Sequence, residues 1–372
     1  MNGSFKVGNL FGIPFYINSS WFLVLALVTF SYGSQLATQF NLGIILPWIL
    51  GLCAALLLFT SVLAHELGHS FVAIKQGIEV KSITLFLFGG LATLERESKT
   101  PGEAFWVAIA GPLVSFILFG IFTAIGTFTN ISGAIAAVVQ LLAYINLVIG
   151  TFNLIPGLPL DGGNILKSAV WKITGNPYKG VLFAGRVGQF FGWMAIISGL
   201  IPVLFFGSFN NFWNVLIGAF LLQNAGMAAQ SANVQDKLTK FTAADAVTPD
   251  SPVIFAHLSL REFANEYVIG KNPWRKFLVI DESGKFMGEL LVDDMKHIPT
   301  HEWPTTQVKA LMKPADIQFV KSTQNLLEVV TKLEEYKVTE LPVIDENGVV
   351  LGILEKSGIK TLLQDRATMK TA

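Results

Sequence analysis

Charged side chains are scarce in the first two thirds of this 372-residue chain. Residues 1–235 carry only 15 of the 52 Asp, Glu, Lys and Arg residues, about 6% of that part, whereas residues 236–372 carry 37, about 27%. Residues 7–64, 104–160 and 187–235 contain none. Soluble domains are about 25% charged. The scarcity excludes an ordinary soluble fold for the first part and predicts a membrane part followed by one soluble module.

Cysteine is nearly absent, the net charge is zero, and the N-terminal residues do not have the pattern of a cleaved signal peptide. Cys53 is the only cysteine, so no disulfide can form within the chain. The formal net charge is zero, which argues against the basic surface that phosphate recognition needs, and we expect no direct nucleic-acid binding. The N-terminus lacks the short apolar core and cleavage site of a signal peptide, so the first apolar segment is expected to be a retained span.

The uncharged stretches predict six membrane spans. Each stretch is long enough for two helices of about 20 apolar residues. The turns within each pair carry no charge, whereas the connections between pairs carry the lysines and arginines that mark the cytoplasmic side. The sequence therefore predicts a multi-pass protein of the cell membrane, embedded in the lipid bilayer, with both termini and the soluble part in the cytoplasm. The spans are placed near residues 15–32, 44–74, 104–127, 133–155, 188–207 and 211–229.

The connection from Ile78 to Leu94 differs from the other loops. It is rich in β-branched and aromatic residues and is broken by Gly89 and Gly90. This composition predicts a hairpin or short sheet at the membrane interface. An open edge of such a sheet can receive an extended peptide. A sheet that only covers the membrane part is the alternative.

The second span ends in VLAHELGHSF, which places His65, Glu66 and His69 in an otherwise apolar helix. Histidines four residues apart share a helix face and can bind one zinc ion, while the neighbouring carboxylate holds a water and takes its proton. Ionisable residues cost roughly 2.5–3.5 kcal/mol each within a span, so a chance match is the weaker interpretation. The pattern predicts hydrolysis of an amide bond.

Asp161 is the candidate third metal ligand, and it is the only Asp before residue 236. It lies in FNLIPGLPLDGG, where Pro156 and Pro159 break the helix and Gly162 and Gly163 allow close backbone approach. Irregular backbone at membrane depth is tolerated only where it is buried in protein or lines a cavity. We therefore expect a broken helix to bring this carboxylate to the histidines. A helix cap is the alternative role.

Together, the HELGH and NLIPGLPLDGG motifs resemble those of the site-2 protease family of intramembrane zinc metalloproteases. The resemblance implies one zinc ion (Zn2+) per chain, bound by His65, His69 and Asp161, with Glu66 activating the water. It also implies that Asn153 steadies the substrate or the developing oxyanion, for which a structural role is the alternative. The implied substrate is a transmembrane protein such as an anti-sigma factor or a membrane-tethered transcription factor.

One feature of that family is missing here. The segment AGPLVSF at residues 110–116 resembles the family's third-span pattern, but the Asn that commonly follows near Ser115 is absent. Gly111 and Pro112 interrupt a span, and we assign them to helix packing or a bend rather than to catalysis.

An internal duplication organises the soluble part. FLVIDESGKFMGELL from Phe277 and LPVIDENGVVLGILE from Leu341 align at an offset of 64 residues, and each follows an amphipathic helix pattern. Two such copies resemble a pair of CBS domains, an α/β Bateman module, and imply a homodimer through it. The predicted division is a metalloprotease domain at 1–229, a linker at 230–242 and the tandem module at 243–372, with copies at about 243–302 and 307–366.

CBS pairs commonly bind an adenine nucleotide through a G-x-x-T/S-x-x-D segment. The first copy keeps Asp294 six residues after Gly288 but has Leu291 at the hydroxyl position, and the second copy loses both polar positions. Asp294 is therefore the one candidate contact to a nucleotide ribose, with a solvated helix cap as the alternative. A module that only dimerises or gates substrate fits the sequence equally well.

The predicted fold class is a polytopic α-helical membrane protein of about six spans with a small interfacial β-element, followed by a cytosolic α/β tandem CBS module. The predicted function is regulated intramembrane proteolysis by a zinc endopeptidase that cuts near the cytoplasmic leaflet, with the module regulating or dimerising it. A CBS-gated transporter is one alternative, and it predicts ionisable residues on several facing spans. A catalytically silent substrate-binding scaffold is the other, and the intact Glu66 argues against it.

Overall fold

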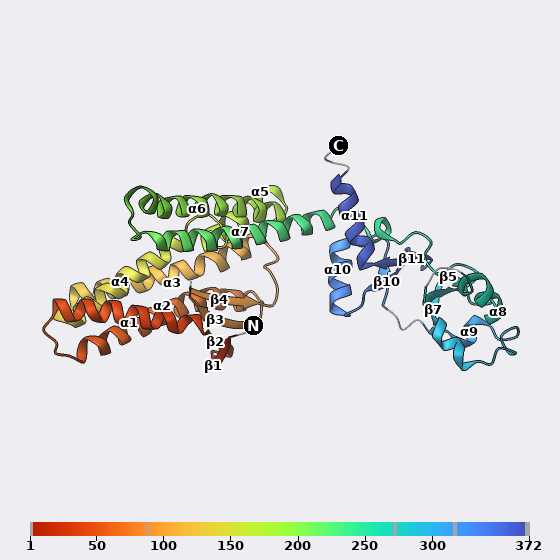
Figure 1. The fold of residues 1–372 in the computed structure, drawn as a ribbon, viewed down its shortest axis with the longest axis horizontal. Coiled ribbons are helices and arrows are strands. Elements are labelled where there is room, and N and C mark those ends of the chain that lie inside the picture. The colour runs from red at the N-terminus through yellow and green to blue at the C-terminus, as the bar shows by residue number, and fades with distance from the viewer. Residues whose placement is uncertain (1–2, 88, 271–273, 315–317, 369–372) are drawn as a thin grey trace. The chain divides into compact units, whose positions relative to one another are not determined.

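The chain divides into two units, residues 1–233 and residues 234–372. The structure is a computed structural model that describes residues 3–87, 89–270, 274–314 and 318–368 (Figure 1). The last four residues of the predicted CBS module, 369–372, lie outside the described residues.

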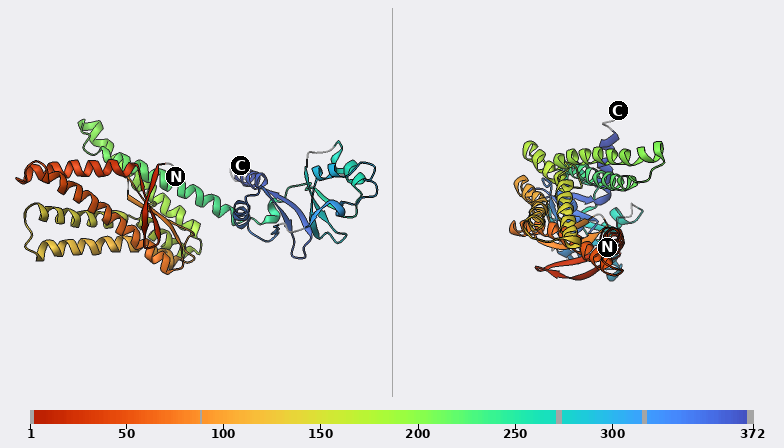
Figure 2. Two further views of the ribbon diagram at one scale, coloured as in Figure 1. Left: turned by 90° about the horizontal axis from the view of Figure 1, so that it is seen from below. Right: turned by 90° about the vertical axis from the view of Figure 1, so that its left-hand side faces the viewer.

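Long apolar helices make up most of the first unit. Six helices in the described residues are long and apolar enough to cross a membrane, which confirms the predicted number of spans. Figure 2 shows them running side by side in the first unit. They are α1 (Ser20–Gln39), α2 (Leu46–Lys75), α3 (Pro101–Phe128), α4 (Gly133–Asn153), α6 (Pro177–Phe206) and α7 (Phe212–Leu238), and the shorter α5 (Asp161–Thr174) lies between α4 and α6 in sequence.

Some predicted helix boundaries are wrong. The first span was expected from residue 15, but Ile13–Asn18 is a strand and the helix begins at Ser20. The fifth span was expected from residue 188, but α6 begins at Pro177 because proline fits the first helical turn and the Asn176 side chain accepts hydrogen bonds from the N–H groups of Tyr178 and Lys179. Helix α7 continues to Leu238, through most of the expected linker.

A four-stranded sheet packs against the end of α2. Its strand order is β1-β2-β3-β4, with β2 and β3 parallel and the other pairs antiparallel. The predicted hairpin at residues 78–94 forms β3 and β4, and β4 is one of the two edge strands. The other two strands were not predicted: the second overlaps the expected start of the first span, and the first lies in a stretch to which no element had been assigned. The strands are β1 (Ser4–Leu10), β2 (Ile13–Asn18), β3 (Val80–Phe86) and β4 (Gly89–Leu94).

Helices α2 and α3 approach closely at the level of the HExxH motif. A Cβ atom on Gly68 would lie only 2.9 Å from the carbonyl oxygen of Ala110. Small residues at helix interfaces in membranes permit such close backbone contact. The packing places the histidine face of α2 directly against α3.

The second unit contains two sheets that repeat one layout. In each, a short strand lies parallel to the first strand of an antiparallel hairpin. The two hairpins are offset by 64 residues, which confirms the internal duplication. The strands are β5 (Val253–Phe255), β6 (Lys276–Ile280), β7 (Phe286–Leu291) and β8 (Lys313–Pro314) in one sheet, and β9 (Val320–Lys321), β10 (Glu340–Ile344) and β11 (Val350–Glu355) in the other.

Helices cover these sheets, and each sequence copy contributes to the core of the other. Ala243, near the start of the first copy, is buried with Val343 of the second, whereas Val308, at the start of the second copy, is buried with Phe277 of the first. The two copies therefore depend on each other for a complete core. The helices are α8 (Leu260–Phe263), α9 (Val308–Leu311), α10 (Leu326–Glu335) and α11 (Lys356–Thr368), with short helical turns at Ala243–Ala246, Ala264–Val268 and Val292–His297.

One lysine also joins the two copies. Lys276 Nζ on β6 lies 2.9 Å from Glu289 Oε1 on β7 and 3.0 Å from Glu340 Oε1 on β10. Burial alone would lower the pKa of the Lys276 ammonium, but the hydrogen bonds to both carboxylates outweigh it and raise the pKa above its usual value. Because the pKa is raised in the folded state, this ammonium stabilises the fold at every pH below its unfolded pKa of about 10.4, and the contribution is lost as the pH rises above that value.

Replacing this lysine should loosen the module. In Lys276→Met, two partly buried carboxylates lose their shared cation, which we expect to cost about 1–3 kcal/mol. Hydrogen–deuterium exchange of the full-length protein should show faster exchange in β6, β7, β10 and β11 and unchanged exchange in α2 and α3. Lys285→Met, at an exposed lysine of the same hairpin, is the matched control. Equal exchange in the two variants would contradict this role.

Candidate metal centre

Three of the predicted site residues lie in one turn of α2 and point away from solvent. His65 is 3% exposed, and Glu66 and His69 are each 9% exposed. The two imidazole rings share one face of the helix, with ring centroids 4.9 Å apart. Two imidazoles and a carboxylate in an apolar helix are costly to bury without partners, so their convergence indicates a site.

The irregular segment between α4 and α5 brings Asp161 to these histidines. Asp161 is the first residue of α5, where it follows a loop that folds back on itself. Cβ atoms on Gly162 and Gly163 would overlap backbone atoms of Leu154 and Leu158, so only glycine permits this loop path. The predicted broken helix is thus present, and it ends with the carboxylate against α2.

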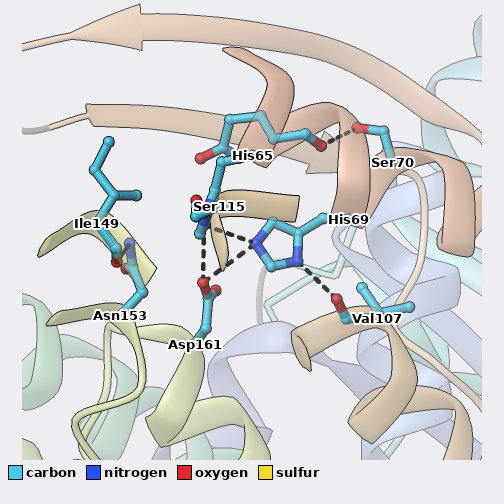
Figure 3. A network of polar contacts seen from close by, with 9 residues as sticks. His65, His69, Ser70, Val107, Ser115, Ile149, Asn153 and Asp161 are labelled. Carbon is cyan, nitrogen blue, oxygen red and sulfur yellow. Dashed lines mark hydrogen bonds and ion pairs between the residues drawn. The ribbon is translucent and has the colours of Figure 1, made fainter. Parts of the chain in front are cut away.

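The three expected donor atoms converge on one point, as Figure 3 shows. Asp161 Oδ2 lies 3.0 Å from His65 Nε2 and 3.2 Å from His69 Nε2, and the two Nε2 atoms are 3.3 Å apart. Ligands about 2.0–2.2 Å from a tetrahedral zinc ion are separated by about 3.3 Å. These separations and the N2O donor set therefore fit a zinc ion.

The second nitrogen of each imidazole is also engaged. His69 Nδ1 lies 2.6 Å from the carbonyl oxygen of Val107, so Nδ1 carries the proton and donates it. His65 Nδ1 lies 2.9 Å from Ser115 Oγ, which is buried. Metal-binding histidines are usually fixed in this way by a partner on the opposite ring nitrogen. The carbonyl partner leaves the Nε2 lone pair of His69 for a cation, and His65 presents its own in the tautomer whose Nδ1 donates to Ser115.

Two residues of α3 have a role at the site that the sequence interpretation missed. Gly111 had been assigned to helix packing or a bend, yet a Cβ there would overlap His69 Nε2 and lie 2.7 Å from His65 Nε2. Ser115, one turn later on the same face, is the partner of His65. The sequence pattern that could have indicated this role is a glycine and a serine four residues apart, in the span that follows the HExxH span.

Glu66 and Asn153 lie beside the three donors. The Glu66 carboxylate accepts a backbone hydrogen bond from Ala92 of β4, and a Cβ on Gly90 would overlap the Glu66 side chain. The edge strand therefore covers this carboxylate. Asn153 ends α4, and its amide Nδ2 donates to Ile149 O at 3.0 Å. Both predicted residues thus lie at the site, and their roles stay predictions.

Two cavities meet at this group. The first, of about 350 Å³, is lined by polar residues of α5 and by β4. The second, of about 310 Å³, is lined mainly by apolar residues of α4, α7 and the start of the β4 hairpin. Four residues line both: His65, Glu66, Gly90 and Asn153. The carboxylate can thus be approached from a polar side and from an apolar side.

Asp294, the candidate nucleotide contact, lies in the helical turn after β7. Its Oδ2 is 3.4 Å from Lys313 Nζ, and its side chain is 23% exposed. Leu291 ends β7 at the position where a hydroxyl was lacking. Nucleotide binding at this residue stays a prediction.

The fold and the donor set define a membrane-embedded metallohydrolase. The model of peptidase family M50 matches residues 53–132 and 130–196, and that of the CBS domain matches residues 308–365. A putative zinc metalloprotease of Synechocystis is 56% identical over 368 residues, which cover 99% of this chain and 97% of that protein. A putative zinc metalloprotease of Mycobacterium tuberculosis is 28% identical, covering 98% and 93%.

Among solved structures, the site-2 protease of Methanocaldococcus jannaschii is 30% identical, with a TM-score of 0.45, and the match covers 61% of this chain and 95% of that one. From the extent and level of the Synechocystis match, the chain belongs to peptidase family M50, the site-2 proteases. It is a multi-pass membrane zinc metalloprotease with a CBS module.

Gly111→Ala should disturb the metal site without removing a ligand. The added methyl group overlaps both imidazole nitrogens, so the rings must move, and we expect zinc affinity to fall about tenfold or more. Gly120→Ala is the matched control, because a Cβ at Gly120 of the same helix meets nothing within 4 Å. Zinc retained against graded chelator would be measured by elemental analysis. Equal retention in the two variants would show that Gly111 does not set the space for the metal.

Proposed function

We propose that this protein is an intramembrane endopeptidase that cuts a membrane-spanning protein substrate near the cytoplasmic leaflet. The observation that carries the proposal is the convergence of His65 Nε2, His69 Nε2 and Asp161 Oδ2 beside Glu66, inside a bundle of apolar helices. The family supplies the class of reaction, and the position of the site supplies the class of substrate.

His65, His69 and Asp161 are the proposed zinc ligands, one ion per chain. Zinc, when bound, lowers the pKa of a water toward neutrality and polarises a carbonyl oxygen. Ser115 and Val107 orient the two imidazoles, and the Gly162-Gly163 pair allows the carboxylate to approach. The protein thereby fixes three donors before substrate arrives.

Glu66 is the proposed general base, and it takes the proton of the attacking water. Its carboxylate lines the polar cavity, where water can enter, and also the apolar cavity, where a substrate segment can lie. A general base contributes about 10²–10⁴-fold to rate when it is within hydrogen-bond reach. Asn153, at the junction of both cavities, is the proposed donor to the substrate or to the developing oxyanion.

Strand β4 is the proposed holder of the substrate backbone. A transmembrane helix satisfies its own amides, so a bond becomes accessible only after the helix unwinds. Strand β4 lines the polar cavity beside Glu66 and lies at an edge of its sheet, where an extended segment can be added. An unwound substrate can therefore replace its lost helical hydrogen bonds by pairing with β4.

Charge on the connecting segments supports a cytoplasmic location of the site. Lys75 ends α2 six residues after His69, about 9 Å along the helix. Lys81, Arg96 and Lys99 follow in the next connection. Positive connections face the cytoplasm. We therefore place both termini and the CBS module in the cytoplasm as well.

The CBS module is the proposed regulatory and dimerising part. Its two copies complete each other's cores and are joined by Lys276, so a ligand that changes their pairing would act on the module as a whole. The proposed ligand of the module is an adenine nucleotide that contacts Asp294. The proposed protein partner is a second copy of this chain, with which the module forms a homodimer. Anti-sigma factors and membrane-tethered transcription factors remain the proposed substrates. Because the chain belongs to a metalloprotease family, we reject the alternative that it is a CBS-gated transporter.

Glu66→Gln should separate chemistry from folding. Cleavage of a single-span substrate with a Gly-Pro pair near its cytoplasmic end should fall about 10²–10⁴-fold, because the amide cannot take the proton of the water. Zinc content should remain that of the wild type. Glu79→Gln, at an exposed glutamate in the connection after α2, is the control and should cleave normally. Undiminished cleavage by Glu66→Gln would overturn the assigned role, and absence of cleavage by the wild type would favour the silent scaffold.

A further inference from the structure

A lysine lies inside the polar cavity without a part in the proposed chemistry. Lys167 is on α5, six residues after Asp161, and its side chain is only 13% exposed. It is the only lysine or arginine among the described residues that line this cavity. A charged amine buried to this degree requires an anionic or strongly accepting partner. A substrate that enters the cavity must therefore leave this partner in place or supply another one.

That partner is a carboxylate in the connection that follows β4. Lys167 Nζ lies 2.7 Å from Glu97 Oε2, and Glu97 follows the end of β4 by three residues. Leu91, Ala92 and Leu94 of β4 also line the cavity on the strand side. The ion pair thus links the connection after β4 to α5 at the lining of this cavity.

An extended substrate paired with the free edge of β4 runs along this same lining. It must therefore pass the ion pair or replace it. Breaking the ion pair costs the two side chains different amounts of free energy. The Glu97 side chain is 79% exposed, so water can solvate it, whereas the Lys167 side chain is only 13% exposed and would lose its partner. Solvent-exposed ion-pair partners are exchanged at little cost. A substrate carboxylate can take the place of Glu97, but an apolar side chain cannot.

We propose that Lys167 is a specificity-determining residue that binds an acidic side chain of the substrate, in exchange for Glu97. This inference rests on the proposed function. Six residues of helix separate Lys167 from Asp161 by about 9 Å along the axis, and an extended chain advances about 3.3 Å per residue. The preferred acidic residue therefore lies about three residues from the scissile bond.

The experiment uses full-length protein and a set of matched single-span substrates. Each substrate carries one Asp or one Asn, moved through the positions on both sides of the scissile bond. Binding is measured with the non-cleaving Glu66→Gln protein in detergent, and cleavage with protein that retains Glu66. Asp at a position about three residues from the bond should bind about fivefold more tightly than Asn at the same position, mainly through KM in the cleavage assay.

Charge variants distinguish recognition from a structural role. Lys167→Met should remove the preference, and Lys167→Glu should reverse it in favour of a substrate with Lys at that position. Glu97→Gln should strengthen binding of the Asp substrate, because the internal competitor is gone. Lys172→Met, at an exposed lysine of the same helix, is the matched control and should keep the wild-type preference.

Retention of the Asp preference in Lys167→Met, or equal binding of Asp and Asn substrates at every position, would overturn the inference. Cleavage without a charge preference would leave the proposed function standing and remove only this inference. A charge preference in binding without cleavage by the wild type would support the role of Lys167 and contradict the proposed function.

Discussion

Three electron-rich atoms, His65 Nε2, His69 Nε2 and Asp161 Oδ2, lie within 3.3 Å of one another inside a bundle of apolar helices. The packing of the surrounding helices and loop is what permits this close approach. Two histidine nitrogens and a carboxylate oxygen at such distances need a positive charge or a shared proton between them, and their separations suit the proposed zinc cation. The close packing of α2 on α3, the absence of a side chain at Gly111 and the glycine pair after Asp161 all make room for that cation. The site is thus a property of backbone packing as much as of its ligands.

The same packing explains how a hydrolase operates within a bilayer. In the proposed reaction, water enters through the cavity lined by α5 and β4, and the cavity on the other side of Glu66 is lined by apolar residues of α4 and α7. The edge strand β4 covers the carboxylate and offers backbone partners to an unwound segment. The Lys167–Glu97 ion pair lies at the polar cavity, on the path proposed for such a segment. Metal, water and substrate therefore reach one point from separate directions.

Much of this arrangement was predictable from the sequence, because membrane helices make charged and helix-breaking residues stand out. His65, Glu66, His69 and Asp161 were found in this way, and so were the six spans. Ser115 and Gly111 were not, since small residues carry no chemical signature until their neighbours are known. The strand at Ile13–Asn18 was missed because an apolar strand beside an apolar helix has the same composition. Each CBS copy contributes its first residues, such as Ala243 and Val308, to the core of the other copy. This arrangement depends on tertiary packing and leaves no local sequence pattern.

X-ray absorption at the zinc edge of the purified full-length protein tests the central claim most directly. We expect one zinc ion with two imidazole nitrogens at about 2.0–2.1 Å and carboxylate oxygen at about 2.0–2.2 Å. In Asp161→Ala, the carboxylate contribution should disappear and the zinc content should fall. A wild-type shell containing sulfur or more than two imidazoles, or a shell unchanged in Asp161→Ala, would contradict the His65-His69-Asp161 site.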